Sequence, residues 1–245
     1  MSDYAELTAS SLSALAEQYR AIAHNLANVS TPGYKRLQTS FVRVLEAAAA
    51  GAGEATSPPS GQISPDTTVD FRQGALTQTG HRLDLALDGS GFFVVESPDG
   101  TLYTRNGKFR TNAQGQLTDA SGRTVVGEGG PLIIPTTVSL ASVSVSPDGT
   151  VAAGSQAIGK LKIVDFEDPS QLTPVGDHCL EAPGTVQPIA AETTRVRQGF
   201  FESSNVSAIE ELIGLITVTR LYEANVKALT VQDEQMKNIL NVLMS

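Results

Sequence analysis

Both ends of this chain carry apolar residues at helical spacing, and this feature restricts the possible folds more than any other. The first 30 residues contain no glycine or proline, and their apolar residues follow one another at steps of three or four. Such steps place side chains on one face of an α-helix. The stripe consists of Leu12, Leu15, Tyr19, Ile22, Leu26 and Val29. We expect this helix to end near Asn28, because Pro32 and Gly33 follow.

The last 40 residues repeat the pattern. A second stripe recurs at intervals of seven and consists of Leu215, Tyr222, Leu229, Met236 and Leu243. Further apolar residues, among them Ile209, Leu212 and Ile216, widen it. The pattern predicts a helix from about Ser207 to Leu243. Helices with such stripes are marginal alone, so we expect these two to pack on each other, on the rest of the chain, or on neighbouring molecules.

Between the two helices the sequence changes to short apolar segments separated by turns. Residues 47–65 are rich in alanine, glycine, serine and proline, which predicts a flexible or extended linker. Short β segments follow at 83–87, 92–95, 101–104, 143–145 and 161–164. The pentapeptide Ser-Pro-Asp-Gly-Thr occurs at 97–101 and again at 146–150. Because this sequence suits a type I turn, we expect two hairpins.

The resulting fold-class prediction is α+β. The N- and C-terminal helices are expected to form a coiled-coil-like helical domain, with an inserted β-rich domain of short antiparallel strands. Residues 1–30 and 203–245 would make a discontinuous helical axial-core domain. Residues 31–75 would be a linker and extended connecting region, and residues 76–202 the β-rich outer domain.

The composition excludes several classes of function. The chain has 17 Lys and Arg residues against 26 Asp and Glu residues, a net charge of -9, so it lacks the positive charge that binds nucleic acid phosphates. One cysteine, Cys179, and three histidines make a metal site improbable. The first residues do not resemble a secretory signal peptide, and no apolar run is long enough to span a membrane. We expect no cofactor, no metal and no membrane insertion.

The sequence offers only weak candidates for catalysis. Asp84, Asp88 and Asp99 could supply a carboxylate pair for glycoside hydrolysis if they faced one another across a cleft. Two of them precede glycine, as turn residues do, and Asp84 alternates with leucines, which predicts a solvent-facing position on a strand. Cys179 follows His178, but adjacent residues on an extended chain point in opposite directions. We therefore predict no catalytic residue.

Three groups of motifs, spread over nearly the whole chain, resemble the bacterial flagellar rod and hook family of axial proteins. The first is Asn-Leu-Ala-Asn-Val-Ser-Thr-Pro-Gly-Tyr-Lys at 25–35. The second comprises Leu-Ala-Leu-Asp-Gly-Ser-Gly-Phe-Phe-Val-Val at 85–95 and Tyr-Thr-Arg-Asn-Gly-Lys-Phe at 103–109. The third comprises Gly-Phe-Phe-Glu-Ser-Ser-Asn-Val at 199–206 and Arg-Leu-Tyr-Glu-Ala-Asn at 220–225. Within the family, the length and the central motifs are most similar to the proximal and distal rod proteins.

This resemblance implies a structural subunit of the flagellar basal-body rod and no enzymatic activity. Such subunits polymerise through their terminal helices into the drive shaft that carries motor torque to the hook. The implied partners are further copies, other rod proteins, neighbouring hook subunits and the flagellar export apparatus, through which the chain would pass without a cleaved signal peptide. The implied location is the periplasm-spanning rod of the basal body.

The resemblance also assigns roles to particular residues. The signature turn is made of Asn28, Thr31, Pro32, Gly33, Tyr34 and Lys35. We read it as a fixed bend after the first helix, although an ordinary helix stop would explain the proline and glycine equally well. The eleven stripe residues at the two ends would form the assembly interface, within and between subunits. Two alternatives are a β-domain hydrolase acting on a glycan and a non-flagellar filament subunit.

Overall fold

The fold divides into two compact units in a computed structural model that describes residues 2–45, 61–191 and 193–243. The terminal unit comprises Met1–Ala27, Leu37–Val69 and Ser207–Ser245. The central unit comprises Asn28–Arg36 and Asp70–Val206. Each unit has its own buried apolar cluster, and the two are described separately below.

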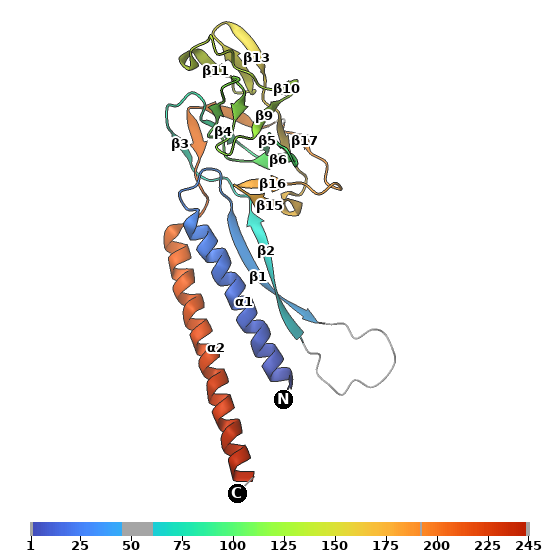
Figure 1. The fold of residues 1–245 in the computed structure, drawn as a ribbon, viewed down its shortest axis with the longest axis vertical. Coiled ribbons are helices and arrows are strands. Elements are labelled where there is room, and N and C mark those ends of the chain that lie inside the picture. The colour runs from blue at the N-terminus through green and yellow to red at the C-terminus, as the bar shows by residue number, and fades with distance from the viewer. Residues whose placement is uncertain (1, 46–60, 192, 244–245) are drawn as a thin grey trace. The chain divides into compact units, whose positions relative to one another are not determined.

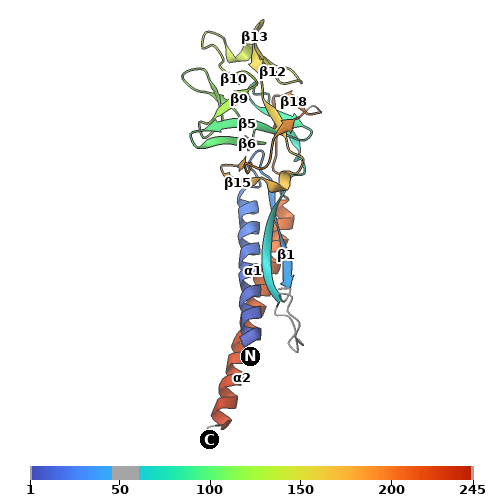
Figure 2. The ribbon, with the colours of Figure 1, turned by 90° about the vertical axis from the view of Figure 1, so that its right-hand side faces the viewer.

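The terminal unit contains two long helices and a pair of strands. Helix α1 (Ser2–Ala27) and helix α2 (Ala208–Leu243) lie side by side and antiparallel, as both ribbon views show (Figures 1 and 2). Strands β1 (Arg36–Leu45) and β2 (Gly61–Asp70) form a two-stranded sheet. Both predicted helices are confirmed, with bounds within one residue of those expected.

The two helices share only a small apolar contact. Leu15 and Ile22 of α1 are buried against Val218 of α2, with Leu215 partly buried beside them. Gly214 lets the helices approach closely, because a Cβ added there would lie 3.3 Å from Ile22 Cδ1. Most other large apolar residues of the described part of α2 are exposed. Among the side chains that the structure describes, the helix pair therefore buries a minor part of its apolar surface.

The predicted fold class is wrong. Within the described ranges α1 and α2 are the two α-helices, and most of the remaining regular structure is β-strand in antiparallel sheets. A coiled-coil-like helical domain is not present, since the compact unit that holds both helices also holds β1 and β2. The heptad spacing identified which residues share a helix face, but spacing does not show what covers that face.

Strands also occupy part of the segment predicted to connect the helix to the β region. β1 and β2 fall within residues 31–75, where an extended chain was expected and a strand pairing was not. The predicted linker at 47–65 overlaps β2 at residues 61–65, and its other residues lie outside the part of the chain that the structure describes.

The central unit is built from short strands. A branched sheet of ten strands follows the order β15-β16-β6-β5-β9-β8-β7, with β10 beside β9, β14 beside β5, and β17 beside β14. Separate sheets are β11-β12-β13, β18-β4 and β19-β3. The bounds are β3 Leu76–Gln78, β4 Leu85–Asp88, β5 Phe92–Ser97, β6 Gly100–Thr104, β7 Arg110–Thr111, β8 Leu117–Thr118, β9 Thr124–Gly127, β10 Gly130–Pro131, β11 Val143–Val145, β12 Thr150–Ala153, β13 Gln156–Lys160, β14 Ile163–Asp165, β15 Thr173–Gly176, β16 Cys179–Glu181, β17 Ile189–Ala190, β18 Arg195–Gln198 and β19 Phe200–Glu202.

Strand β5 is the centre of this unit. Its continuous apolar run is buried on both sides, because alternate side chains of a strand point to opposite faces. Phe93 and Val95 enter one cluster, where Phe93 meets Phe109 edge to face at 5.1 Å. Phe92 and Val94 enter a second cluster with Tyr103 and Phe166. The unit thus has apolar packing on both faces of its main sheet.

Both predicted hairpins are confirmed. At the first copy of the pentapeptide, β5 pairs with β6 and Ser97 lies opposite Gly100, so Pro98 and Asp99 form the turn. At the second copy, β11 pairs with β12, and the Gly149 amide donates to the Ser146 carbonyl at 2.9 Å. Identical pentapeptides therefore reverse the chain at both positions, although the strands pair in different registers around them.

Candidate functional site

The signature turn after α1 has a tightly fixed backbone. The Thr31 amide donates to the Asn28 carbonyl at 3.1 Å, and the Thr31 hydroxyl donates to Asn28 Oδ1 at 3.1 Å. Gly33 has a φ of 70° and donates its amide to the Glu202 carbonyl at 2.7 Å. A Cβ at Gly33 would lie 2.4 Å from the Asn106 nitrogen, so no other residue fits without movement of the backbone.

The last two residues of the turn are buried. The Tyr34 ring packs edge to face on His178, with centroids 5.8 Å apart. Lys35 Nζ lies 2.5 Å from Glu202 Oε1 and donates to the Arg72 carbonyl at 2.9 Å. Arg105 Nη1 lies 3.4 Å from the other carboxylate oxygen of Glu202. We call Lys35, Arg105 and Glu202 the Glu202 cluster.

The Glu202 cluster places two cations and one anion in the interior. All three side chains are at least nine-tenths buried. Burial lowers the pKa of Lys35 and of Arg105, while the Glu202 carboxylate acts in the opposite direction on both. Main-chain partners complete the cluster: Gly74 donates its amide to Glu202, and Arg105 donates to the Gly89 carbonyl at 2.8 Å. The cluster therefore depends on its single carboxylate.

The Asn205 side chain forms further hydrogen bonds close to the Glu202 cluster. Its Oδ1 accepts the Arg36 amide at 2.7 Å, and its Nδ2 donates to the Asp70 carbonyl at 2.8 Å and to the Arg72 carbonyl at 3.1 Å. The sequence motif at 199–206 thus joins the residue after the signature turn to the segment at 70–72. Spacing alone did not reveal this, because the partners are more than one hundred positions apart.

The structure distributes the predicted assembly residues unevenly. Leu15, Ile22 and Leu215 come together in the buried contact between the helices. Leu12, Leu26 and Leu229 are half-buried, whereas Tyr19 and Tyr222 are exposed. Val29 lies in the turn beyond the end of α1, so it does not continue the helical stripe. The side chains of Met236 and Leu243 lie outside the described part of the chain.

A groove opens between α1 and α2 beside this contact. It encloses about 440 Å³ and is lined by Leu15, Ala16, Tyr19, Arg20, Val218, Thr219 and Tyr222. Aliphatic side chains and the rings of two tyrosines make most of the groove surface. Arg20 is the one charged residue that lines it. Such a lining favours an apolar segment of protein over a charged small molecule.

The described residues supply little for catalysis. Asp84 is buried and accepts a hydrogen bond from the Thr79 hydroxyl at 2.7 Å, so its predicted solvent-facing position is wrong. Asp88 pairs with Arg197 at 3.1 Å, and Asp99 lies in the β5–β6 turn. Burial raises the pKa of the Cys179 thiol to about 11, which keeps it protonated at neutral pH. In the described ranges no group of three His, Cys, Asp or Glu residues could hold a metal ion.

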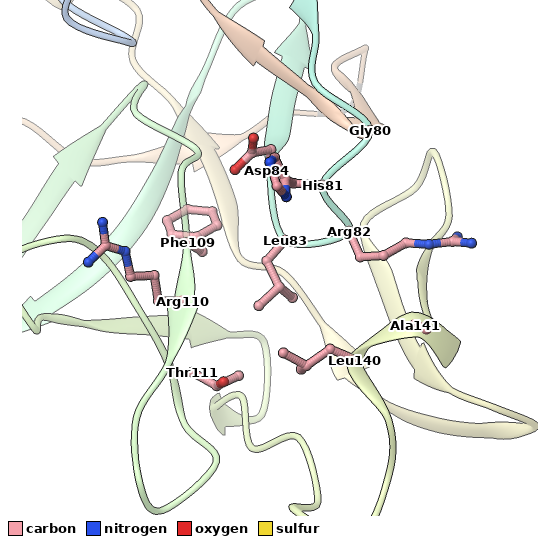
Figure 3. A pocket seen from close by; sticks show the side chains of 10 residues that line it. All are labelled: Gly80, His81, Arg82, Leu83, Asp84, Phe109, Arg110, Thr111, Leu140 and Ala141. Atoms are coloured by element: carbon pink, nitrogen blue, oxygen red, sulfur yellow. The ribbon is translucent and has the colours of Figure 1, made fainter.

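A second hollow, in the central unit, also lacks a carboxylate pair. It encloses about 510 Å³, and Asp84 is its one acidic residue among the lining side chains. Leu83 and Leu140 point toward one another across it, while Arg82 and Arg110 project away to opposite sides (Figure 3). Glycoside hydrolysis needs two facing carboxylates. Among the residues that the structure describes, no helix is long and apolar enough to cross a membrane.

Comparisons with known proteins decide the family. The family described as "Flagella basal body rod protein" matches residues 7–35. The "Flagellar hook protein FlgE/F/G D1 domain" matches 86–153, and "Flagellar basal body rod FlgEFG protein C-terminal" matches 197–242. The flagellar basal-body rod protein FlgF of Caulobacter vibrioides is 34% identical over 84% of this chain and 83% of its own length. The chain belongs to the flagellar basal-body rod protein family.

Other members of the flagellar rod family are similarly related. The flagellar basal-body rod protein FlgG of Agrobacterium fabrum is 32% identical over 93% of this chain and 94% of its own. The FlgG protein of Bacillus subtilis is 32% identical over 90% of this chain and 91% of its own. As a rod family member, the chain is a structural subunit of the rod and is located in the flagellar basal body. The matches support neither alternative, a glycan hydrolase or a non-flagellar filament subunit.

The Glu202 cluster takes one residue from each of the three matched segments. Lys35 lies in the first matched segment, Arg105 in the second and Glu202 in the third. The three segments that mark a flagellar rod protein therefore each contribute one ion to a single buried site. The sequence motifs had suggested three separate features, and the structure joins them.

Proposed function

We propose that this rod subunit polymerises through the apolar faces of α1 and α2, and that the polymer is the drive shaft that carries torque from the motor to the hook. The observation that carries this proposal is the exposed apolar surface of α2, which includes Ile209, Ile213 and Ile216. Soluble monomers rarely expose contiguous apolar surface of this kind unless it serves as an interaction site.

The predicted assembly residues enter this proposal with two roles. Leu15, Ile22 and Leu215 would hold α1 to α2 within one subunit, because they share a buried contact. Tyr19 and Tyr222, which are exposed, would contact neighbouring subunits, as would the remaining stripe residues. The signature turn would act as a fixed bend, a role that its hydrogen bonds and the rigid position of Gly33 support.

Each of the predicted segments of the sequence would have its own role in the rod. Residues 1–30 and 203–245 would supply the contacts along the rod axis, 31–75 the connection, and 76–202 the β-rich outer part. The partners would be further copies and other rod or hook subunits. The export apparatus would deliver the chain, which a single cysteine favours because no internal disulfide can block an unfolded passage.

Neither catalysis nor nucleic acid binding forms part of the proposal. The net charge of -9 opposes binding to phosphates. The buried Cys179 and the separately engaged Asp84 and Asp88 leave the described residues without an assembled catalytic group.

Electron microscopy of basal bodies from a deletion strain tests the proposed function. We expect non-motile cells whose rods stop short of the hook, and recovery when the wild-type chain is supplied. Supplying the Asp99→Asn variant should restore motility equally, because Asp99 is an exposed turn residue. Motile cells with full-length rods in the deletion strain would refute the proposal.

A further inference from the structure

Helix α2 is apolar on two opposite sides in its first turns. One side faces α1 and includes the buried Val218 and the partly buried Leu215. At 3.6 residues per turn, four other residues fall within an arc of about 100° on the side opposite Val218. These residues are Ile209, Leu212, Ile213 and Ile216, with exposed fractions of 72%, 46%, 61% and 55%. We call them the patch.

The patch and the groove between α1 and α2 lie on different faces of the same unit. On α2 the groove is lined by Val218, Thr219 and Tyr222, whose midpoint lies roughly seven residues beyond the middle of the patch, or about 11 Å along the helix axis. Because α2 is one continuous helix, the patch cannot fold back into the groove of its own chain. Among the described residues of the same chain nothing covers the patch, so a second molecule is the occupant that we consider.

We propose that the patch of one copy of this chain seats in the groove of a second copy. This inference rests on the proposed function and names its contact. Two different surfaces that meet head to tail leave one patch and one groove free at the ends of every pair, so the contact can repeat. Where the rotation between successive copies does not close a ring, such repetition builds an open helical assembly, whereas a contact between like faces would stop at a dimer.

The chemistry of the two surfaces favours a second copy as the occupant. The patch offers branched aliphatic side chains, and the groove offers the rings of Tyr19 and Tyr222 as amphipathic walls. Groups of opposite sign lie at the two rims: Arg20, which pairs with Glu17 of its own helix at 2.6 Å, borders the groove with its guanidinium exposed, and Glu210 lies exposed beside the patch. Because exposed charges are screened by ions, association should weaken modestly as salt rises.

A mixing experiment with the full-length chain tests the contact. Ile213→Asp damages the patch, and Tyr19→Asp damages the groove. We expect the wild-type chain to form oligomers larger than dimers with rising concentration in sedimentation velocity, and each variant alone to associate at least 10-fold more weakly. An equimolar mixture should form a 1:1 dimer that grows no further, because only one intact patch and one intact groove remain. Thr230→Asp, at an exposed polar position of α2 outside both surfaces, should behave as wild type.

Three outcomes would overturn the inference: a wild-type chain that stays monomeric, variants that associate normally, or a mixture that forms no dimer. The last would indicate a symmetric contact or another partner. Thr219→Arg provides a second groove variant, and unchanged thermal melting checks that each variant folds. In cells, normal rods built from both variants would refute this contact and leave the proposed function standing. Full-length rods in the deletion strain would refute the function itself.

Discussion

The central and terminal units treat their apolar residues in opposite ways. In the central unit, β5 buries four consecutive apolar residues, Phe92 to Val95, against packing on both faces. In the terminal unit, α2 leaves Ile209, Leu212, Ile213 and Ile216 exposed in the single chain. One unit completes its core from its own sequence. The other has more apolar surface than a single chain covers, which is the pattern expected of a subunit that assembles.

Charged residues follow the same division. The Glu202 cluster of the central unit is enclosed, so removing one ion leaves the others without compensation. The Arg20–Glu17 pair of the terminal unit joins exposed side chains at 2.6 Å, and pairs of this kind contribute little to stability. Substitutions in the two units should therefore separate into large and small effects.

The largest effect is expected from Glu202→Ala, which would leave two buried cations unpaired. We expect the free energy of unfolding of the central unit to fall by about 3–5 kcal/mol, as when other buried ion pairs are broken. Urea denaturation followed by near-ultraviolet circular dichroism measures this change. Asp99→Ala is the matched control at an exposed carboxylate and should change stability by less than about 0.5 kcal/mol. A loss below about 1 kcal/mol for Glu202→Ala would show that the cluster is solvated.

A second pair of substitutions compares an isoleucine buried in the contact between the helices with an isoleucine exposed on α2. Ile22→Ala removes a buried side chain between α1 and α2 and should cost about 2–3 kcal/mol. Ile216→Ala removes the same atoms from an exposed position and should cost less than about 0.5 kcal/mol in the monomer. Thermal melting of the helical circular dichroism signal distinguishes them. Equal losses would mean that Ile216 is already covered within one chain.

A smaller effect is expected from Asn25→Ala, which detaches the end of α1 from β1. Asn25 Nδ2 donates to the Leu37 carbonyl at 2.8 Å, and Asn25 Oδ1 accepts the Leu37 amide at 2.8 Å. Loss of both bonds should cost about 1–2 kcal/mol. Hydrogen exchange at the Leu37 amide should accelerate, with no change at the β5 amides. Unchanged protection at Leu37 would mean that this amide finds another acceptor.

The last effect concerns Cys179 and changes the stability only at alkaline pH. Its folded pKa of about 11 lies above the ordinary value of 9.0, so the folded state holds the proton more tightly than the unfolded state. This contribution to stability is complete below pH 9 and is lost as the pH rises from 9 toward 11. Cys179→Ala should flatten that part of a stability profile measured by urea denaturation. At pH 8 the Cys179 thiol of the folded protein should react slowly with an alkylating reagent, and unfolding in urea should make it react quickly. Rapid labelling of the folded protein would contradict the burial of Cys179.

The sequence predicted the local elements well because their causes are local. Apolar residues at steps of three, four and seven predicted both helices, and the run from Phe92 to Val95 predicted the central strand. The two faces of α2 were merged into one stripe, because Ile209, Leu212 and Ile216 at offsets of three and four look like a broader version of the heptad. Only the packing of α1 shows that they point away from it.

Long-range pairings could not be predicted from spacing. Lys35 and Glu202 each stood out within a motif, yet nothing in a single sequence pairs charges 167 positions apart. The β1–β2 pairing was missed for a related reason, since its segment was read by composition as a connection. Asp84 shows a further limit: alternation with leucine predicted exposure, but its side chain is buried and accepts a hydrogen bond from the Thr79 hydroxyl, while its backbone forms a β-bridge with Lys108.

The Glu202 cluster also bears on the order in which the central unit can fold. Its carboxylate stands 167 positions after Lys35 and 97 after Arg105, so a chain that emerges N-terminus first presents both cations long before their anion. Until Glu202 is present the burial of either cation is unfavourable, and the signature turn lacks the contacts that Gly33 and Lys35 make with Glu202. In a partly synthesised chain that still lacks Glu202 the cluster cannot form, so we expect the central unit to complete its packing only after residue 202 is present.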